Sequence, residues 1–361
     1  MSSSQQHLIF VGRYATVDQP GILAFDFDET SGTLAPCGSA AGVVNPSFLT
    51  VHPNGRWLYT TSETNQAQGG ISGGVWALRF ERDAAAVTIT PLNHRSSNGD
   101  DPCHVLLDER GQWLVTTNYT SGSVAVFPVL TDGSLGEMSD FDQHDGSSVV
   151  AGRQEGPHAH SATWTPDNQR IIVADLGTDQ LFVYDFDHSG GKLGTPVRTA
   201  TRPGSGPRHM VFHPNRRLVY VANELDSTVS VYDYDAASAR LREQQFVPTI
   251  PSGTGESLVA DIHLSPAGER LYVSNRGHNS IAVFDVGEDG QLTGVATPSC
   301  GGNWPRNFAV SPDDRFILVS NQYSGDLAVL PVDGGAEALG EPVGHAAVPQ
   351  AACILFVHAH E

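Results

Sequence analysis

Apolar and polar residues alternate along most of the chain in short runs of about four to eight residues. The runs are rich in Val, Ile, Tyr and Phe, and turns containing Pro, Asn, Asp or Gly separate them. Alternation with a period of two is typical of β-strands, and no segment shows the 3.6-residue period of an amphipathic helix. The pattern therefore predicts an all-β protein.

One unit of sequence recurs six times inside the chain. Each copy has an apolar strand, a short turn that usually contains Pro, and a second strand that ends in a polar pair. The turns fall at residues 53, 109, 166, 214, 266 and 312, so the period runs from 46 to 57 residues. About four strands in a unit of this length is typical of a β-propeller blade rather than of a helical repeat.

The two ends of the chain complement each other. Residues 7–36 contain a second and a third strand without a first, and residues 352–357 look like a first strand with nothing after it. Together they predict a seventh blade that closes the ring with strands from both termini. The alternative, two stacked β-sandwiches, explains neither the even period nor these ends. We therefore expect one domain over residues 1–361, a seven-bladed β-propeller with four-stranded antiparallel blades.

Charge and cysteine usage narrow the classes of partner. The chain has 40 acidic and 20 basic residues, a formal net charge of −20. Nucleic acids and anionic membranes require a basic surface, so neither is an expected partner. Four scattered cysteines without a CxxC pair predict free thiols in a reducing compartment. Since no signal peptide or ~18-residue apolar run is evident, we expect a soluble cytoplasmic protein. We also expect it to be monomeric or weakly self-associating.

Equivalent positions in the blades of a propeller form rings about its axis. A position that serves only structure should repeat one residue type, as the turn prolines nearly do, so a ring of mixed types predicts a functional pocket. Two rings are mixed. The ring at the ends of the second strands consists of Arg13, Glu63, Tyr119, Leu176, Glu224, Arg276 and Gln322. The ring at the starts of the first strands consists of Ser47, Cys103, His160, Arg208, Ala260 and Arg306, each with the residue after it.

The residues of these rings predict an anionic ligand and acid/base chemistry. Arg208, Arg276 and Arg306 can form forked hydrogen bonds with carboxylate or phosphate. His160 or Glu224 can act as the general base, with the other as its orienting partner. No Gly-x-Ser-x-Gly elbow or evident Cys–His pair is present, so a covalent acyl-enzyme is not expected. These groups suit water attack on a lactone, or ring closure to one, with a guanidinium stabilising the oxyanion.

A metal site is the alternative for the same residues. His158 with His160, or Glu63 with Glu224, could provide two ligands. A third close ligand is missing, and the nearby arginines repel a cation. We therefore expect no metal and no cofactor.

Five segments, in order, are more specific than the repeat. They are residues 153–161 (RQEGPHAHS), 206–209 (GPRH), 220–225 (YVANEL), 273–281 (VSNRGHNSI) and 304–308 (WPRNF). Through them the chain resembles the seven-bladed propeller lactonases, which include bacterial 6-phosphogluconolactonases and fungal carboxymuconate cyclases. The resemblance covers essentially the whole chain. It implies that a His, two Arg and a Glu act in the pocket, namely His160 (or His158), Arg208, Glu224 and Arg276.

The resemblance implies hydrolysis of a sugar-acid lactone, with 6-phospho-glucono-1,5-lactone as the first candidate. The alternatives are a cycloisomerase that forms a lactone from a muconate-type acid, and a scaffold that binds proteins without chemistry. Lys192 is the single lysine, so a phosphate would depend on Arg and His. The residues expected to contact the substrate are His158, His104, His209, Arg306, Asn307, Gln322 and Arg13. The segment before His158 is long enough to cover the mouth of the pocket.

Overall fold

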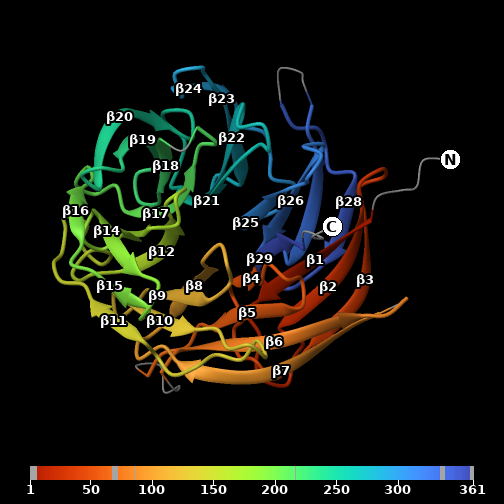
Figure 1. Cartoon of the computed structure of the whole chain (residues 1–361). Helices are drawn as coiled ribbons and strands as arrows, with labels where there is room; N and C mark the ends of the chain where they lie inside the picture. Colours follow the sequence, from red (N-terminus) through yellow and green to blue (C-terminus); the bar gives the residue numbers. More distant parts are fainter. Residues whose placement is uncertain (1–5, 67–71, 85, 216, 334–337, 358–361) are drawn as a thin grey trace.

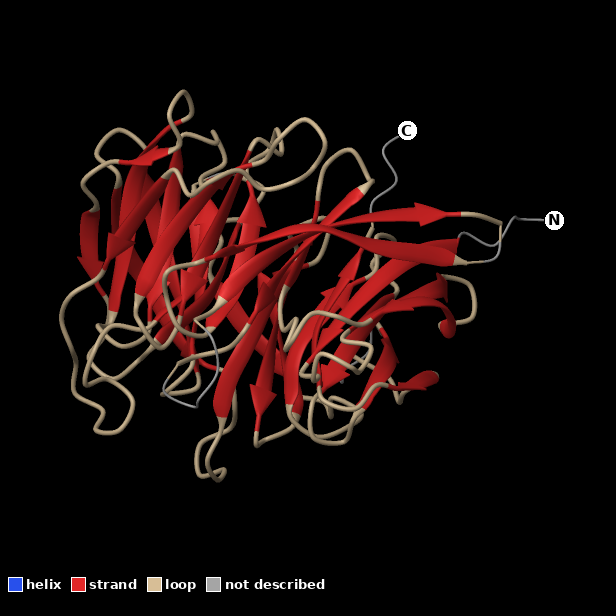
Figure 2. Cartoon of the chain, turned by 90° about the horizontal axis from the view of Figure 1, so that it is seen from below, coloured by secondary structure: helices blue, strands red, loops and turns tan. Residues whose placement is uncertain are grey.

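The structure, a computed structural model, describes residues 6–66, 72–84, 86–215, 217–333 and 338–357. This part of the chain consists of strands joined by turns and loops (Figure 2). Seven antiparallel sheets stand side by side in a ring (Figure 1). The predicted seven-bladed all-β propeller is confirmed. Within the described residues, no helix has the length and apolar character needed to cross a membrane.

Six blades run outward from the axis in chain order, because consecutive strands are hydrogen-bonded neighbours, and the seventh begins with the last strand of the chain and continues with the first three. The innermost strands, which contact one another around the ring, are β4 (Leu49–Val51), β8 (Pro102–Leu107), β12 (Ala159–Trp164), β17 (Pro207–Phe212), β21 (Leu258–Leu264), β25 (Pro305–Val310) and β29 (Ala351–Phe356). The second strands, which are almost completely buried between blades, are β5 (Trp57–Ser62), β9 (Trp113–Asn118), β13 (Arg170–Asp175), β18 (Leu218–Asn223), β22 (Arg270–Arg276), β26 (Phe316–Asn321) and β1 (Gln6–Arg13).

The outer half of each blade becomes progressively more exposed. The third strands are β6 (Gly74–Arg82), β10 (Ser123–Pro128), β14 (Gln180–Asp187), β19 (Thr228–Asp235), β23 (Ser280–Val286), β27 (Asp326–Pro331) and β2 (Ile22–Asp28). The rim strands are β7 (Val87–Ser96), β11 (Asp140–Gln143), β20 (Arg240–Pro248), β24 (Leu292–Ala296), β28 (Gly344–Ala347) and β3 (Thr33–Ala40). In the remaining blade the rim is split into β15 (Lys192–Leu193) and β16 (Val197–Ala200), and both pair with β14.

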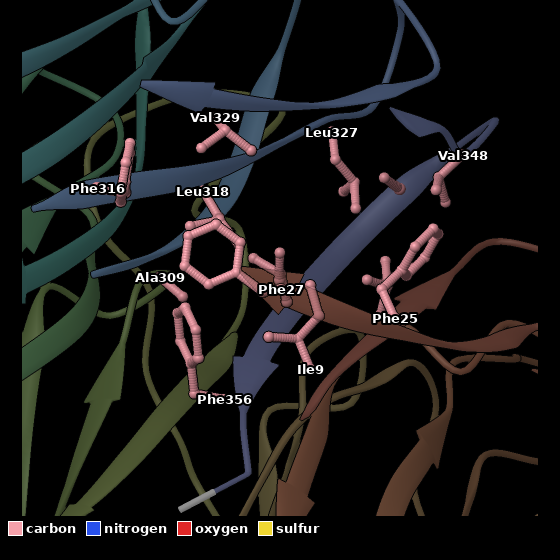
Figure 3. Packing of buried hydrophobic residues seen from close by; sticks show 13 residues of the cluster. Ile9, Phe25, Phe27, Ala309, Phe316, Leu318, Leu327, Val329, Val348 and Phe356 are labelled. Carbon is pink, nitrogen blue, oxygen red and sulfur yellow. The ribbon is translucent and has the colours of Figure 1, made fainter. Parts of the chain in front are cut away.

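Strands from both ends of the chain form the closing blade, as predicted. β29 pairs with β1 in antiparallel register, with Ile9 opposite Phe356. Figure 3 shows the apolar cluster that joins this blade to its neighbour, in which Phe27 meets Phe316 and Phe356 edge to face at 5.7 and 5.6 Å. Full burial of such a side chain contributes about 1.5–3 kcal/mol. Closure therefore rests on side-chain packing as well as on the β29–β1 ladder.

The turns that carry the repeat signature are held by their own side chains. In the turn after β25, Ser311 Oγ donates to Asp313 Oδ1 at 2.7 Å, and the backbone N–H of Arg315 donates to the same oxygen at 3.1 Å. Pro312 fixes the first turn angle, and Asp314 adopts a left-handed φ of 58° that Asp tolerates well. The Ser-Pro-Asp-Asp pattern thus specifies a tight turn between first and second strands.

Most of the innermost strands contain a β-bulge near their start. In β8, β12, β17 and β25 one residue has no partner on the second strand, and these unpaired residues are Cys103, His160, Arg208 and Arg306. In β21 the irregularity spans Ala260 and Asp261. A bulge interrupts the alternation of a strand, so two successive side chains can reach the same site. Five of the six positions predicted for the mixed ring at the first-strand starts therefore lie in bulges, and the sixth, Ser47, precedes β4, whose ladder with β5 is regular.

Candidate active site

Glu224 is the centre of a buried cluster of charges. It follows β18 directly and is 3% exposed. Arg208 Nε donates to its Oε2 at 3.0 Å, Arg276 Nη2 lies 2.9 Å from the same oxygen, and Arg153 Nη2 donates to Oε1 at 2.5 Å. Burial alone raises the pKa of Glu224, but the charges of Arg276, Arg208 and Arg153 outweigh it and hold the pKa at about 2. Glu224 is therefore anionic at neutral pH.

The arginines around Glu224 keep donors that the protein does not use. Arg208 Nη1 donates to His209 Nε2 at 3.1 Å and to the carbonyl of Ala260, while Nη2 has no hydrogen-bond partner among the described residues. Arg276 Nη2 also donates to the carbonyl of Val259 at 3.0 Å, and its Nε is buried without a partner there. Burial and the charge of Arg276 lower the pKa of Arg208 to about 10, so it stays cationic at neutral pH. Unused guanidinium donors in a buried cluster are suited to a developing oxyanion.

His160 lies beside this cluster, on the bulge of β12. Its side chain is 6% exposed, and Nε2 lies 3.9 Å from Glu224 Oε2. Burial, followed by the charge of Arg208, holds the pKa of His160 well below its ordinary value. The imidazole is therefore neutral at pH 7 and has a lone pair for a proton. A neutral imidazole within reach of a ligand is a competent general base.

Cys103, which occupies the same ring position as His160 in the preceding blade, packs against the other edge of His160. Its Sγ lies 3.7 Å from His160 Nδ1 and donates to the His160 carbonyl at 3.1 Å. Burial raises the pKa of the Cys103 thiol to about 12. The group stays protonated at neutral pH, and a thiol in that state is a poor nucleophile.

His158 packs against Tyr119, next to the Glu224 cluster. Its ring stacks on Tyr119 with centroids 4.5 Å apart, and Nδ1 lies 2.8 Å from the Tyr119 carbonyl oxygen. The Tyr119 hydroxyl accepts from Arg153 Nη2 at 3.3 Å. His158 thus packs behind Tyr119, which in turn holds Arg153 over Glu224.

A pocket of about 730 Å³ opens beside the cluster. Arg153, Arg276 and Trp304 line it together with apolar side chains that include Ile250. Trp304 has a left-handed φ of 67°, and its ring lies 5.6 Å from the Arg276 guanidinium carbon. Such a conformation is strained for a bulky residue and is typical of functional sites. The pocket has the size and mixed lining of a small-molecule site.

Arg306, Glu63 and Tyr14 form a separate group outside the lining of this pocket. The Tyr14 hydroxyl donates to the two Glu63 oxygens at 2.8 and 2.9 Å. Arg306 Nη2 lies 3.8 Å from Glu63 Oε1, and its guanidinium carbon lies 5.3 Å from the Tyr14 ring centroid. No other polar partner of Arg306 is found among the described residues, and its side chain is 18% exposed. Most donors of Arg306 are therefore open to a ligand.

Three of the predicted substrate contacts are bound to one another or to Asp261 and not to Glu224. His209 Nδ1 lies 2.7 Å from Asp261 Oδ1, and Asn307 Nδ2 donates to Asp261 Oδ2 at 2.5 Å. The His104 ring packs on Phe48 at 4.3 Å and meets His209 edge to face at 5.6 Å. His209 and Asn307 are buried and His104 is partly buried, and His209 accepts a hydrogen bond from Arg208 of the cluster.

Arg13 and Gln322 are not part of the Glu224 cluster. Arg13 donates to the backbone carbonyls of Pro20 and Pro349 at 2.7 and 3.3 Å. Gln322 Nε2 donates to Gln350 Oε1 at 3.2 Å. Both side chains are thus bound to connecting loops.

Sequence reasoning missed four residues of the site: Arg153, Tyr14, Asp261 and Trp304. Arg153 and Trp304 belong to segments that carried the family resemblance, and Asp261 belongs to a mixed ring, so a signal existed for each. For Tyr14, which follows the ring position Arg13, no comparable signal was present.

The donor set favours an anion over a metal ion. Across the described ranges, no three His, Cys, Asp or Glu side chains are arranged to hold a metal ion. The two carboxylates that sequence analysis considered, Glu63 and Glu224, are each paired with arginine. The arrangement can bind an oxyanion and hold a neutral base beside it.

Comparison with known proteins identifies the family. The family described as "Lactonase, 7-bladed beta-propeller" matches residues 8–356. A 6-phosphogluconolactonase of Bacillus subtilis is 36% identical over 355 residues, which cover 98% of this chain and 99% of the relative. A 6-phosphogluconolactonase of Formosa agariphila is 33% identical, covering 89% of this chain and 91% of the relative. The solved periplasmic gluconolactonase of Pseudomonas aeruginosa superposes with a TM-score of 0.90 at 33% identity, covering 98% and 99% of the two chains. The chain belongs to the seven-bladed β-propeller lactonase family.

Proposed function

We propose that the chain hydrolyses a sugar-acid lactone, with 6-phospho-glucono-1,5-lactone as its substrate, by acid/base chemistry without a metal. The observation that carries the proposal is the neutral His160 imidazole beside the Glu224–arginine cluster. The relatives named 6-phosphogluconolactonase support the same substrate.

The reaction needs a base, an oxyanion site and an acid. His160 Nε2 removes a proton from water as the water oxygen attacks the lactone carbonyl carbon. Unused donors of Arg208 and Arg276 stabilise the resulting oxyanion. When the tetrahedral intermediate collapses, the bond from the carbonyl carbon to the ring oxygen breaks, and the His160 imidazolium returns its proton to that oxygen. The product is the open-chain hydroxy acid.

Of the two candidate bases, we favour His160 over Glu224. A carboxylate with a pKa of about 2 is a weak base at neutral pH, and three guanidinium groups occupy its oxygens. Glu224 is better suited to hold the arginines together, since their mutual repulsion would otherwise drive them apart.

Charge balance supports a phosphorylated substrate. Four arginines (153, 208, 276 and 306) are balanced by two glutamates (63 and 224) and by Asp261, which is linked to Arg208 through His209, so a formal excess of one positive charge remains in a chain of net charge −20. A phosphomonoester carries about −1.5 to −2 at neutral pH. Arg306 is the best placed to receive it, because its donors are not committed to Glu224.

We propose further that residues 1–361 form one catalytic domain, since the family match extends over residues 8–356. We also propose that the protein is cytoplasmic. Cys37, Cys103, Cys300 and Cys353 are all free, and three of them are buried, which suits a reducing compartment.

The test is a pH-stat assay with freshly prepared 6-phospho-glucono-1,5-lactone, corrected for spontaneous hydrolysis. We expect acid release well above the spontaneous rate, and a loss of at least about 100-fold in His160→Ala. His345→Ala is the matched control, because His345 pairs with Asp326 on the rim, 48% exposed. Acid release in the presence of the wild-type protein at no more than the spontaneous rate would refute the proposal. Activity on a muconate-type acid in its place would indicate the ring-closing reaction.

A further inference from the structure

Asp261 is a buried carboxylate that three blades share. It lies in the bulge of β21 and is 3% exposed. His209 Nδ1 from β17 lies 2.7 Å from Oδ1, and Asn307 Nδ2 from β25 donates to Oδ2 at 2.5 Å. His263 Nε2 lies 2.9 Å from Oδ2, and the Phe308 N–H donates to the same oxygen at 3.3 Å. Burial raises the pKa of Asp261, but His263 and His209 reverse this and hold it well below its ordinary value.

The hydrogen bonds of His209 define its tautomer. A guanidinium nitrogen can only donate, so the 3.1 Å contact from Arg208 Nη1 requires a lone pair on His209 Nε2. The proton of a neutral ring must then lie on Nδ1, which donates to the Asp261 carboxylate. Burial and the charge of Arg208 lower the pKa of His209 to about 4, so the ring is neutral at pH 7. His209 therefore links a carboxylate to an arginine as a neutral Nδ1–H imidazole.

This link controls the orientation of Arg208. Its Nε is committed to Glu224 Oε2 and its Nη1 to His209 and the Ala260 carbonyl, so the plane of the guanidinium is fixed at two edges. Nη2 is the nitrogen that remains, and it has no acceptor among the described residues. A donor that is fixed before the substrate binds loses little orientational freedom when negative charge develops.

We propose that Asp261 and His209 are positioning residues that aim Arg208 Nη2 at the oxyanion of the lactone. The inference rests on the proposed function, since it assigns a partner to Arg208 in that reaction. Neither residue touches the substrate; Asp261 fixes the tautomer of His209, and His209 fixes the plane of Arg208. Because Asp261 also ties three blades together, its contribution to stability must be separated from its contribution to orientation.

The experiment compares two replacements of His209. Gln can accept from Arg208 and donate to Asp261 as the imidazole does, whereas Leu fills a similar space without either hydrogen bond. We expect His209→Leu to lower kcat about 10- to 100-fold with KM changed less than about threefold, and His209→Gln to recover most of kcat. A residue that only packs the interior would tolerate Leu at least as well as Gln.

Asp261→Asn should lower kcat in the same way, while its control Asp326→Asn, in the rim pair with His345, should not. Thermal unfolding of each variant identifies any loss of activity that comes from loss of folded protein. Equal kcat for folded His209→Leu and wild type would overturn the inference.

Long-range ¹H–¹⁵N NMR of histidine-labelled wild-type protein gives a readout that does not depend on activity. We expect His209 to show a protonated Nδ1 and an unprotonated Nε2 at pH 7, the tautomer that is less common in water. An Nε2–H tautomer or an imidazolium would overturn the inference. If the wild-type protein did not hydrolyse the lactone, the proposed function would fail, while this spectrum would still decide whether His209 links Asp261 to Arg208.

Discussion

Arg153 Nη2 lies 2.5 Å from Glu224 Oε1, although 71 residues of sequence separate the two. The contact joins the long connection between β11 and β12 to the end of β18. The Arg153 side chain is 33% exposed and that of Glu224 only 4%, so the connection covers the carboxylate from the solvent side. The segment that sequence analysis expected to cover the mouth thus provides the third guanidinium of the cluster.

Removal of Arg153 should lower activity without unfolding the protein. Arg153 lines the pocket with a partly exposed guanidinium, and one hydrogen bond from a charged group to the ligand contributes about 1.5–3 kcal/mol, so Arg153→Ala should lower kcat/KM roughly 10- to 100-fold in the lactone assay. The kcat/KM of Arg153→Lys should lie between those of the wild type and Arg153→Ala, because an ammonium keeps the charge but not the planar fork. Arg198→Ala is the control, since it breaks an exposed ion pair to Asp145 in the same connection. Arg153→Ala with wild-type kcat/KM would contradict this role.

Glu224 should stabilise the fold as well as the site. Glu224→Gln leaves three arginines, two of them buried, without their counter-ion, and removing one partner of a buried pair costs about 3–5 kcal/mol. Urea denaturation at pH 7 measures this loss in the free energy of unfolding.

The same carboxylate should make stability depend on acid pH. Its pKa is lowered from 4.5 to about 2 in the folded protein, so its contribution is complete above pH 4.5 and is lost as the pH falls towards 2. The difference in unfolding free energy between wild type and Glu224→Gln should shrink over that interval. A difference that stayed constant between pH 5 and pH 3 would show that Glu224 is not held as a low-pKa anion.

The rate of hydrolysis should fall little as the pH decreases through the ordinary pKa of histidine. His160 acts as a base only when neutral, and burial together with Arg208 holds its pKa well below 6.5. The kcat/KM of the wild type for glucono-1,5-lactone, which lacks the phosphate that itself titrates near pH 6, should therefore stay flat through the ordinary pKa of histidine after correction for spontaneous hydrolysis and fall only at more acid pH. A rate that halves near pH 6.5 would exclude the buried neutral imidazole as the base.

The architecture could be predicted because local patterns in the sequence specify it. Alternating runs specify strands, the Ser-Pro-Asp-Asp type of turn specifies the corners, and the incomplete ends specify the closing blade. The approximate ring of site residues follows from the repeat alone. His160, Arg208, Glu224 and Arg276 were all predicted from ring positions and do lie together.

The rest depends on bulges and long-range contacts that no local pattern encodes. In a regular strand Arg208 and His209 would point to opposite faces, yet the bulge lets Arg208 donate to His209. Arg13 occupies a ring position, but nearby backbone carbonyls of Pro20 and Pro349 take up its donors. Sequence alone therefore identifies the ring but not which of its members converge.

Arg306 should discriminate between phosphorylated and unphosphorylated lactones. Its guanidinium is 3.8 Å from Glu63, the nearest carboxylate, and its donors are otherwise open, whereas Arg208 and Arg276 are held by Glu224. Arg306→Gln should therefore lower kcat/KM for 6-phospho-glucono-1,5-lactone roughly 10- to 100-fold, as expected for loss of one or two charge-assisted hydrogen bonds, and change kcat/KM for glucono-1,5-lactone less than about threefold. The assay compares both lactones on both proteins under the same correction for spontaneous hydrolysis. Equal losses on the two substrates would place Arg306 with the reacting carbonyl instead of the phosphate, and the phosphate site would then have to include Arg153, the other partly exposed guanidinium in the mouth.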